Sequence, residues 1–248
     1  MLLVLRPDQD AFGHLLADAA AGRRVIEVVE RDDGCVFTGD PSYYLAPFRR
    51  WWPQERRAMR FVRGRVLDVG CGAGRVSLHL QERGLDVVGI DVSPLAVQVA
   101  RHRGAVDARV GTIDTVVEAD EQFDTILLLG NNLGLLGGEQ HGQRLLRKLV
   151  HLSSAKGRIL AGSYDPYEGA SELARRYQAR NRDRGKMGGV ERLRVRYRQY
   201  ATPWYEVLFA SRDEVAHLAS ESGWTVKHFV GDSVGYVAVL DLASSFEP

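Results

Sequence analysis

From residue 65 onward, short apolar runs alternate with segments whose apolar residues recur at helical spacing. The runs have strand length, are rich in β-branched residues and stop at Gly or Asp, whereas the segments between them are longer and amphipathic. An alternation of this kind predicts an α/β domain with parallel strands and helices on both faces. The predicted strands are residues 66–69, 86–90, 108–110, 123–129 and 157–162, and the predicted helices include 73–83, the segment that follows Ser93, and 139–151.

The last part of the chain predicts a reversed strand. Residues 211–214 have a capping-box pattern that opens a helix ending at Gly223, and two further apolar runs follow at 224–230 and 235–240. Parallel strands need a crossover of about a dozen residues or more, so these two runs must pair antiparallel. The sheet is therefore expected to be mostly parallel and to end in one antiparallel strand.

Two regions lie outside the regular alternation. Residues 1–63 predict a helix, a hairpin around Asp32-Asp33-Gly34 and a second helix that begins at Pro53, but their apolar faces are too narrow to close a separate core. In the second region, arginines alternate with Leu193, Val195 and Tyr197, as in a half-exposed strand. We expect one domain, 1–248, with an N-terminal cap (1–63), a core (64–165), a lid insertion (166–210) and the end of the sheet (211–248). The cap has an alternative interpretation, as a layer that only covers the sheet or forms a homodimer.

Composition and charge disfavour several classes of function for this chain, namely nucleic-acid-binding, membrane-spanning, disulfide-rich and metal-binding proteins. The chain has 248 residues, 33 Lys and Arg against 32 Asp and Glu, and two cysteines, Cys35 and Cys71. Near-zero net charge provides no overall attraction to nucleic acid or an anionic membrane, and no apolar stretch reaches the length of a membrane span. Two cysteines cannot form a disulfide framework and fit a reducing cytoplasm. The seven histidines are scattered without metal-ligand spacing, so no metal is expected.

The chemistry centres on the sequence Asp68-Val69-Gly70-Cys71-Gly72-Ala73-Gly74 between the first predicted strand and helix. A strand, a glycine turn and a helix place backbone N–H groups at the strand's carboxyl end, where open α/β sheets bind ligands. Gly70 and Gly72 have no Cβ, so a flat ligand can lie on the backbone. A phosphate loop is excluded because no Gly-Lys-Ser/Thr follows. The dinucleotide fingerprint is disfavoured because Arg75 stands where its third glycine would be.

With Asp68 before the turn and Gly89-Ile90-Asp91-Val92-Ser93 after the next strand, the chain resembles the class I S-adenosylmethionine-dependent methyltransferases. The resemblance covers about residues 60–165 by motif and reaches the C-terminus by element order. It implies a Rossmann-like methyltransferase fold: a mostly parallel seven-stranded sheet with an antiparallel last strand, helices on both faces, an N-terminal cap and a β-rich insertion before the last helix. The implied cofactor is S-adenosyl-L-methionine.

Several residues are candidates for holding that cofactor. Asp91, at the end of a strand, is placed to accept hydrogen bonds from both ribose hydroxyls, with capping of the next helix as the alternative. The resemblance implies that Asp68 orients the amino group, whereas a buried acid satisfied by backbone N–H groups is the structural alternative. Many family members carry an acidic residue at the position that Thr112 occupies in this chain, directly after a glycine. Here the acid, Asp114, stands two residues further on, so the residue that contacts the edge of the adenine is left open. The cofactor-binding candidates are Asp68, Gly70, Cys71, Gly72, Asp91, Val92, Thr112, Ile113, Asp114, Gly130 and Asn131.

Methyl transfer is an in-line displacement from an activated donor, so the protein must mainly align the acceptor and exclude water. A general base is needed only where the acceptor is a hydroxyl or an acidic carbon. The polar residues expected nearest the opening are Tyr43, Tyr44, Tyr164 and Asp165, and each also fits the role of a wall residue.

The preferred hypothesis is therefore a methyltransferase that acts on a small molecule. A non-catalytic S-adenosylmethionine-binding or assembly module of the same fold is the alternative from another class. An RNA methyltransferase and an NAD-dependent oxidoreductase are weaker alternatives. The arginines of residues 175–198 fit either an acidic ligand or a solvated face, and no nucleic-acid-binding motif accompanies them.

Overall fold

The computed structural model describes residues 4–118 and 120–243. The chain forms two compact units. The first consists of Met1–Trp51, Arg65–Ala119 and Arg192–Tyr205, and the second of Trp52–Gly64, Asp120–Glu191 and Glu206–Pro248.

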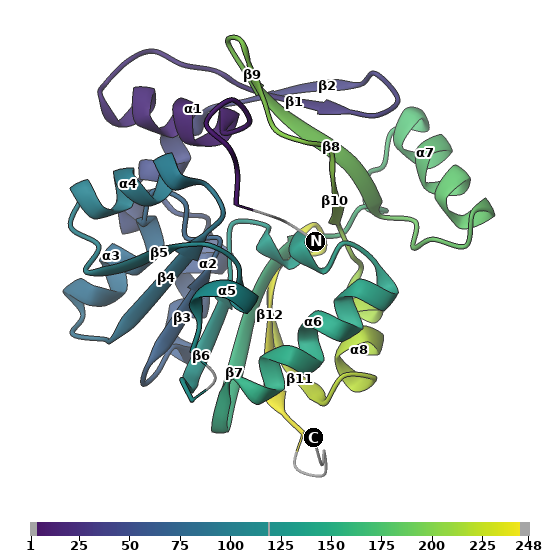
Figure 1. The fold of residues 1–248 in the computed structure, drawn as a ribbon. Helices are drawn as coiled ribbons and strands as arrows, with labels where there is room; N and C mark the ends of the chain where they lie inside the picture. Colours follow the sequence, from purple (N-terminus) through teal and green to yellow (C-terminus); the bar gives the residue numbers. More distant parts are fainter. Residues whose placement is uncertain (1–3, 119, 244–248) are drawn as a thin grey trace. The chain divides into compact units, whose positions relative to one another are not determined.

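The first unit holds three parallel strands with the helices that connect them (Figure 1). The middle strand pairs with both others, so its residues are almost fully buried. Ser93 caps the helix after this strand, because its hydroxyl accepts a hydrogen bond from the Ala96 N–H at 3.0 Å. The elements are β3 (Val66–Val69), α3 (Arg75–Glu82), β4 (Val87–Asp91), α4 (Pro94–His102), β5 (Asp107–Val110) and α5 (Ile113–Val116).

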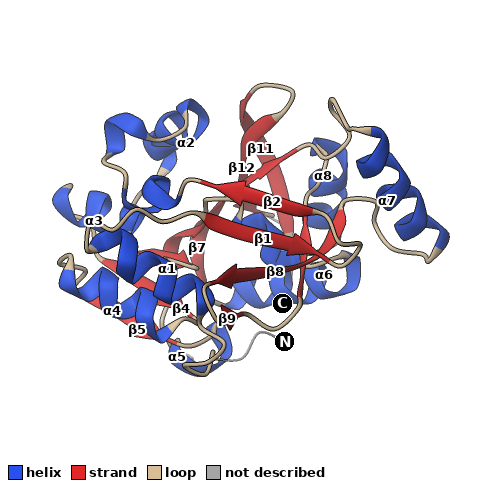
Figure 2. Cartoon of the chain, turned by 90° about the horizontal axis from the view of Figure 1, so that it is seen from above, coloured by secondary structure: helices blue, strands red, loops and turns tan. Residues whose placement is uncertain are grey.

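A second, antiparallel sheet in this unit brings distant segments together. Figure 2 looks onto β2, β1 and β8, which lie side by side. Leu193, Val195 and Tyr197 are buried, as their alternation predicts, and helix α1 packs against the last two. The elements are α1 (Ala11–Ala20), β1 (Glu27–Arg31), β2 (Val36–Gly39), the 3₁₀ turns Pro41–Leu45 and Phe48–Arg50, β8 (Val190–Tyr197) and β9 (Tyr200–Ala201).

Asp10 joins two helices of the first unit. Its buried carboxylate accepts hydrogen bonds from the Gly13 N–H at 2.9 Å, the Ser93 hydroxyl at 2.6 Å and the Leu95 N–H at 3.1 Å. One side chain therefore caps α1 and also holds the first turn of α4, directly after the strand that ends at Asp91.

We expect Asp10→Ala to lower the free energy of unfolding by about 2–4 kcal/mol, because three donors lose a charged acceptor. The melting temperature should fall by roughly 5–15 °C in a calorimetric scan. Asp8→Ala is the matched control, because Asp8 is exposed and, among the described residues, pairs only with the exposed Arg6. Equal melting temperatures for the two variants would contradict the role of Asp10.

The second unit contains the reversed end of the sheet. Strands β6 and β7 are parallel, whereas β12 pairs antiparallel with β7 and β11 pairs antiparallel with β12. Trp224 is 1% exposed and donates its indole N–H to the Leu146 carbonyl at 2.9 Å, which fastens β11 to helix α6. The elements are α2 (Pro53–Ala58), the 3₁₀ turn Met59–Phe61, β6 (Phe123–Leu128), the 3₁₀ turn Asn132–Leu136, α6 (Glu139–His151), β7 (Ser153–Tyr164), α7 (Glu172–Asp183), β10 (Tyr205–Leu208), α8 (Arg212–Ser220), β11 (Trp224–Gly231) and β12 (Gly235–Leu242).

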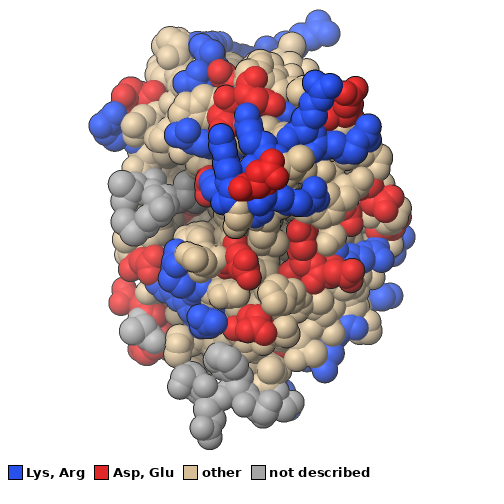
Figure 3. All heavy atoms as spheres, turned by 90° about the vertical axis from the view of Figure 1, so that its right-hand side faces the viewer, with Lys and Arg blue, Asp and Glu red and all other residues tan. Residues whose placement is uncertain are grey.

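Helix α7 was not predicted from the sequence. Its buried side chains are Tyr177, Gln178 and Asn181, so the helical period has almost no apolar component. Asn181 donates to the carbonyls of Gly188 and Val190, which replaces apolar burial by hydrogen bonding. Figure 3 shows the face that carries α7, where basic side chains are interspersed with acidic ones.

Candidate functional site

The glycine turn after β3 has two kinds of glycine. Gly70, Gly72 and Gly74 all have positive φ angles, of 73°, 54° and 76°. A Cβ at Gly74 would lie 3.1 Å from the Cβ of Ala100 in α4, whereas a Cβ at Gly72 would meet nothing nearer than 3.9 Å. Gly74 therefore serves close packing, whereas a Cβ at Gly72 would make only ordinary contacts with Phe12 and Leu16.

Asp91 points back toward that turn. Its Oδ2 accepts from the Gly72 N–H and its Oδ1 from the Ser93 N–H, both at 2.9 Å. Each carboxylate oxygen keeps a lone pair for another donor. Burial raises the pKa of Asp91 to about 6, although the hydrogen bonds from the two N–H groups act to lower it. The side-chain cap of the next helix comes from Ser93 and not from Asp91.

Asp68 and Cys71 line the buried side of the turn. Asp68 is 3% exposed and accepts from the Ser77 hydroxyl at 2.6 Å, so a side chain of α3 orients it. The pKa of the Cys71 thiol lies well above its usual range because of burial and then the charges of Asp91 and Asp68. The thiol is thus neutral and apolar in character. The role of Asp68 toward a cofactor amino group stays a prediction.

Arg75 has a role that was not recognised in the sequence, where it served only to disfavour a dinucleotide site. Arg75 is only 8% exposed. Its guanidinium lies 4.4 Å from the ring centroids of both Tyr43 and Trp51. It also donates to the Tyr43 hydroxyl at 3.2 Å. The cation–π contacts hold the aromatic residues 43–51 against the start of α3. Tyr43, a catalytic candidate, therefore has its hydroxyl engaged by Arg75.

The residues expected near the adenine follow β5. Residues 113–116 form the short helix α5 rather than a simple turn, because Thr112 and Thr115 cap it reciprocally. Ile113 is 8% exposed and Asp114 is exposed. In the neighbouring loop, the Val92 carbonyl accepts from the Leu5 N–H at 2.9 Å.

Four of the predicted residues belong to the second unit. Gly130 and Asn131 both have left-handed φ angles, of 67° and 68°, directly after β6. Tyr164 is 38% exposed and stacks on Phe209 with ring centroids 4.4 Å apart. Asp165 accepts from the Tyr167 N–H at 2.9 Å, as in a local turn. Their roles in binding and catalysis stay predictions.

Part of the chain matches a known family, and almost all of it superposes on a solved structure. Residues 66–157 match the family model described as a methyltransferase domain. The solved structure of an S-adenosylmethionine-dependent methyltransferase from Bacteroides fragilis, in complex with S-adenosyl-L-homocysteine, superposes with a TM-score of 0.84. It is 26% identical, and the match covers 97% of this chain and 98% of that one. Residues 66–157 thus match a methyltransferase domain, and the chain resembles an S-adenosylmethionine-dependent methyltransferase over almost its whole length.

The predicted fold class is confirmed: a mostly parallel seven-stranded methyltransferase sheet with an antiparallel last strand. The CcbJ methyltransferase of Streptomyces caelestis shares this fold with a TM-score of 0.64 at 15% identity, over 96% of this chain and all of that one. Among curated relatives, the ubiquinone biosynthesis O-methyltransferase of Azorhizobium caulinodans is 37% identical over 86 residues, which are 32% of this chain and 34% of that protein. Its Hahella chejuensis counterpart is 40% identical over 92 residues, 35% and 38% of the two chains. These matches span only about a third of each relative.

Neither a metal site nor a membrane-spanning helix is found in the part of the chain that the structure describes. Residues 4–118 and 120–243 contain no group of three or more His, Cys, Asp or Glu that could hold a metal ion. No helix in the same residues has both the length and the apolar character needed to cross a membrane.

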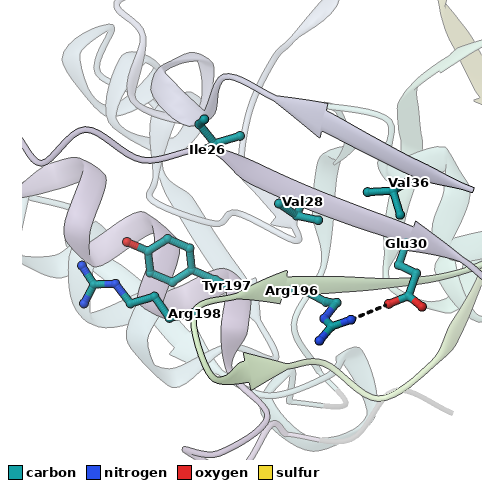
Figure 4. Close-up of a pocket in the computed structure, with 7 residues that line it drawn as sticks. All are labelled: Ile26, Val28, Glu30, Val36, Arg196, Tyr197 and Arg198. Carbon is teal, nitrogen blue, oxygen red and sulfur yellow. Dashed lines mark hydrogen bonds and ion pairs between the residues drawn. The ribbon is translucent and has the colours of Figure 1, made fainter.

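A surface hollow of about 540 Å³ lies on the first unit but contains none of the predicted site residues. Figure 4 shows Arg196 paired with Glu30 across it, at 3.3 Å. The hollow lies on the outer face of β1 and β8. Its lining consists of Ile26, Val28, Glu30, Val36, Arg196, Tyr197 and Arg198.

Glu55 positions the loop after β6 in the second unit. Its side chain is 4% exposed and accepts from the Gly130 N–H at 3.0 Å. Glu55→Ala leaves that N–H without its acceptor, so we expect a loss of about 1–3 kcal/mol of unfolding free energy. Glu55→Gln keeps an acceptor oxygen and should lose less. Denaturant unfolding of both variants measures the difference, and equal losses would show that the hydrogen bond to Gly130 is not the cause.

Proposed function

We propose that this protein binds S-adenosyl-L-methionine at the glycine turn of the first unit and transfers its methyl group to a small-molecule acceptor by in-line displacement. One observation carries the proposal. The Asp91 carboxylate is held rigid by the Gly72 and Ser93 N–H groups, keeps two lone pairs free, and lies beside a glycine whose Cβ position has no neighbour closer than 3.9 Å. Such a pre-oriented acceptor suits the two hydroxyls of a ribose.

The surrounding residues fit an adenosyl cofactor. When bound, S-adenosylmethionine supplies a methyl group on a positively charged sulfur. Asp91 would hold the ribose, the bare backbone of Gly70 and Gly72 would carry the flat part of the ligand, and Asp68 would receive the amino group. Ile113 would provide an apolar surface for the adenine, with Thr112 and Asp114 at its edge. The N-terminal cap (1–63) and the insertion (166–210) would supply the acceptor side.

A hydroxyl on a small molecule is the proposed acceptor group. The curated relatives are named as O-methyltransferases, which supports oxygen as the methylated atom. A nucleic-acid substrate is disfavoured because three arginines of this segment are paired with acids: Arg194 and Arg196 share Glu30, and Arg198 pairs with Asp18. Both cysteines are free thiols, which supports the cytoplasm as the location.

Calorimetry tests the cofactor. We expect binding of S-adenosylmethionine and S-adenosylhomocysteine and none of NAD, and binding of NAD alone would overturn the proposal. A panel of phenols, catechols, aliphatic alcohols and amines with radiolabelled S-adenosylmethionine then tests transfer. Tight cofactor binding without transfer to any of them would favour the non-catalytic module.

A further inference from the structure

At the start of strand β1, an acidic side chain faces inward and an apolar side chain faces outward. Val25 and Val29 pack into the cluster around Ala11 and Leu15, so odd-numbered positions face the interior of the first unit. Ile26, on the other face, is 62% exposed and lines the outer hollow. Glu27 is therefore a half-buried acid on the inner face, next to an exposed isoleucine. A local conflict of this kind is expected where a functional requirement overrides stability.

The partner of Glu27 is a tyrosine. The Tyr44 hydroxyl lies 3.1 and 3.0 Å from the two oxygens of the Glu27 carboxylate. No Lys, Arg or His pairs with Glu27 within the part of the chain that the structure describes. Burial raises the pKa of Glu27, opposed by the hydrogen bond from Tyr44. The carboxylate is thus desolvated and oriented, but it is not neutralised by a cation.

A glycine and a tyrosine lie near this carboxylate. The residue opposite Glu27 on β2 is Gly39, where a Cβ would lie 3.0 Å from Oε2. Burial, and then the charge of Glu27, raise the pKa of Tyr205 to about 12. The Tyr205 hydroxyl has no hydrogen-bond partner among residues 4–118 and 120–243. The oriented carboxylate and the phenol are hydrogen-bonding groups of the kind that bind a hydroxyl group.

Aromatic rings connect Glu27 to the cofactor turn. Tyr44 meets Phe12 edge-to-face with ring centroids 5.1 Å apart. Phe12 in turn supplies the atom nearest to a Cβ at Gly72, at 3.9 Å. Tyr44 and Phe12 therefore form a chain of contacts that leads from Glu27 toward the glycine turn.

We propose that Glu27 is the general base of the reaction and accepts the proton of the acceptor hydroxyl. The inference rests on the proposed function. Glu27 takes the proton while the acceptor oxygen bonds to the methyl carbon and the carbon–sulfur bond breaks. The electron pair of that bond stays on sulfur, so the positive charge of the sulfonium and the negative charge of the carboxylate are both lost. Tyr44 is the positioning residue, since it fixes the carboxylate and stabilises its ionised form.

Three variants test the assignment. Glu27→Gln keeps the shape and an acceptor for Tyr44 but cannot take a proton, so kcat should fall by about 10²–10⁴-fold with S-adenosylmethionine affinity unchanged. Tyr44→Phe keeps the ring and loses the hydroxyl, which should move the acidic limb of the pH–rate profile to higher pH. Glu30→Gln is the control on the outer face of the same strand, and its activity should equal that of the wild type. The acceptors are catechol, phenol and benzyl alcohol.

A second measurement does not depend on turnover. In protein labelled with carboxyl-¹³C glutamate and saturated with S-adenosylhomocysteine, the Glu27 resonance is identified by its loss in Glu27→Gln. We expect catechol to shift it. No shift with any of the three acceptors, or methylation by Glu27→Gln at the wild-type rate, would overturn the inference while leaving the cofactor proposal intact. Failure of the wild type to bind S-adenosylmethionine would overturn the proposed function itself.

Discussion

Asp91→Ala should reduce the affinity for S-adenosylmethionine by about 10²–10⁴-fold, because each hydrogen bond to a charged carboxylate contributes about 1.5–3 kcal/mol and two are lost. The loss should be large because nothing else replaces the acceptor. The two N–H groups that now orient Asp91 belong to Gly72 and Ser93 and are donors, so they cannot accept from a ribose hydroxyl. Isothermal titration calorimetry of the wild type and the variant measures the ratio.

The pH dependence follows from the raised pKa of Asp91. In the free protein this carboxyl titrates at about 6, and ribose hydroxyls stabilise its ionised form. Cofactor affinity should therefore be constant above this pKa and fall as the pH decreases through it, by up to about tenfold per pH unit. In Asp91→Asn this step should be absent.

Asp86→Ala is the matched control for the Asp91 variants. Asp86 directly precedes β4, at the opposite end from Asp91, and forms an exposed pair with Arg65 at 3.1 Å. Its removal should leave affinity and its pH dependence unchanged. If Asp91→Ala bound S-adenosylmethionine as the wild type does, Asp91 would have no place in the site.

The regular half of the fold was predictable because its information is local. Residues 66–74 and 87–94 contain their strand, turn and cap within short stretches, and the elements there begin and end within about two residues of the predicted ones. The strand predicted at 157–162 is longer than expected, because β7 extends over Ser153–Tyr164. Where burial is polar, the periodicity has no apolar component to detect, and for that reason α7 was missed.

Contacts between residues that are far apart in the sequence could not be derived in this way. Tyr44 and Glu27 are 17 positions apart, and Asp10 and Ser93 are 83 apart, and neither pair is part of a sequence motif. Tyr44 was a candidate by its residue type and place in the chain. Its partner Glu27 was not, because it stands in an ordinary strand pattern, and only the fold shows that it faces inward.

The second large effect is a contrast between two glycines of the same turn. Gly74→Ala should lower the unfolding free energy by about 2–4 kcal/mol, for two reasons. A residue with a Cβ is strained in the left-handed conformation that Gly74 adopts, and the new methyl group overpacks the core. That Cβ would lie 3.1 Å from Ala100, in the packed core between the turn and α4. The melting temperature should fall by roughly 5–15 °C, whereas the cofactor affinity of the folded fraction should change little.

Gly72→Ala should have the opposite outcome. The methyl group would make only ordinary van der Waals contacts, with Phe12 at 3.9 Å and Leu16 at 4.0 Å, so only the left-handed conformation costs stability, about 1–2 kcal/mol. The same methyl group stands on the backbone face that we assign to the ligand, so S-adenosylmethionine affinity should fall at least about tenfold, the equivalent of 1.4 kcal/mol.

Gly84→Ala isolates the backbone contribution in this comparison. Gly84 has a φ of 78° after the end of α3, and a Cβ there would have nothing within 4 Å. It should match Gly72→Ala in melting temperature and the wild type in affinity. Calorimetry measures the S-adenosylmethionine affinity of the three variants, and thermal scans measure their melting temperatures. If Gly72→Ala bound S-adenosylmethionine as tightly as Gly84→Ala, the open face of the turn would not be the surface on which the cofactor lies.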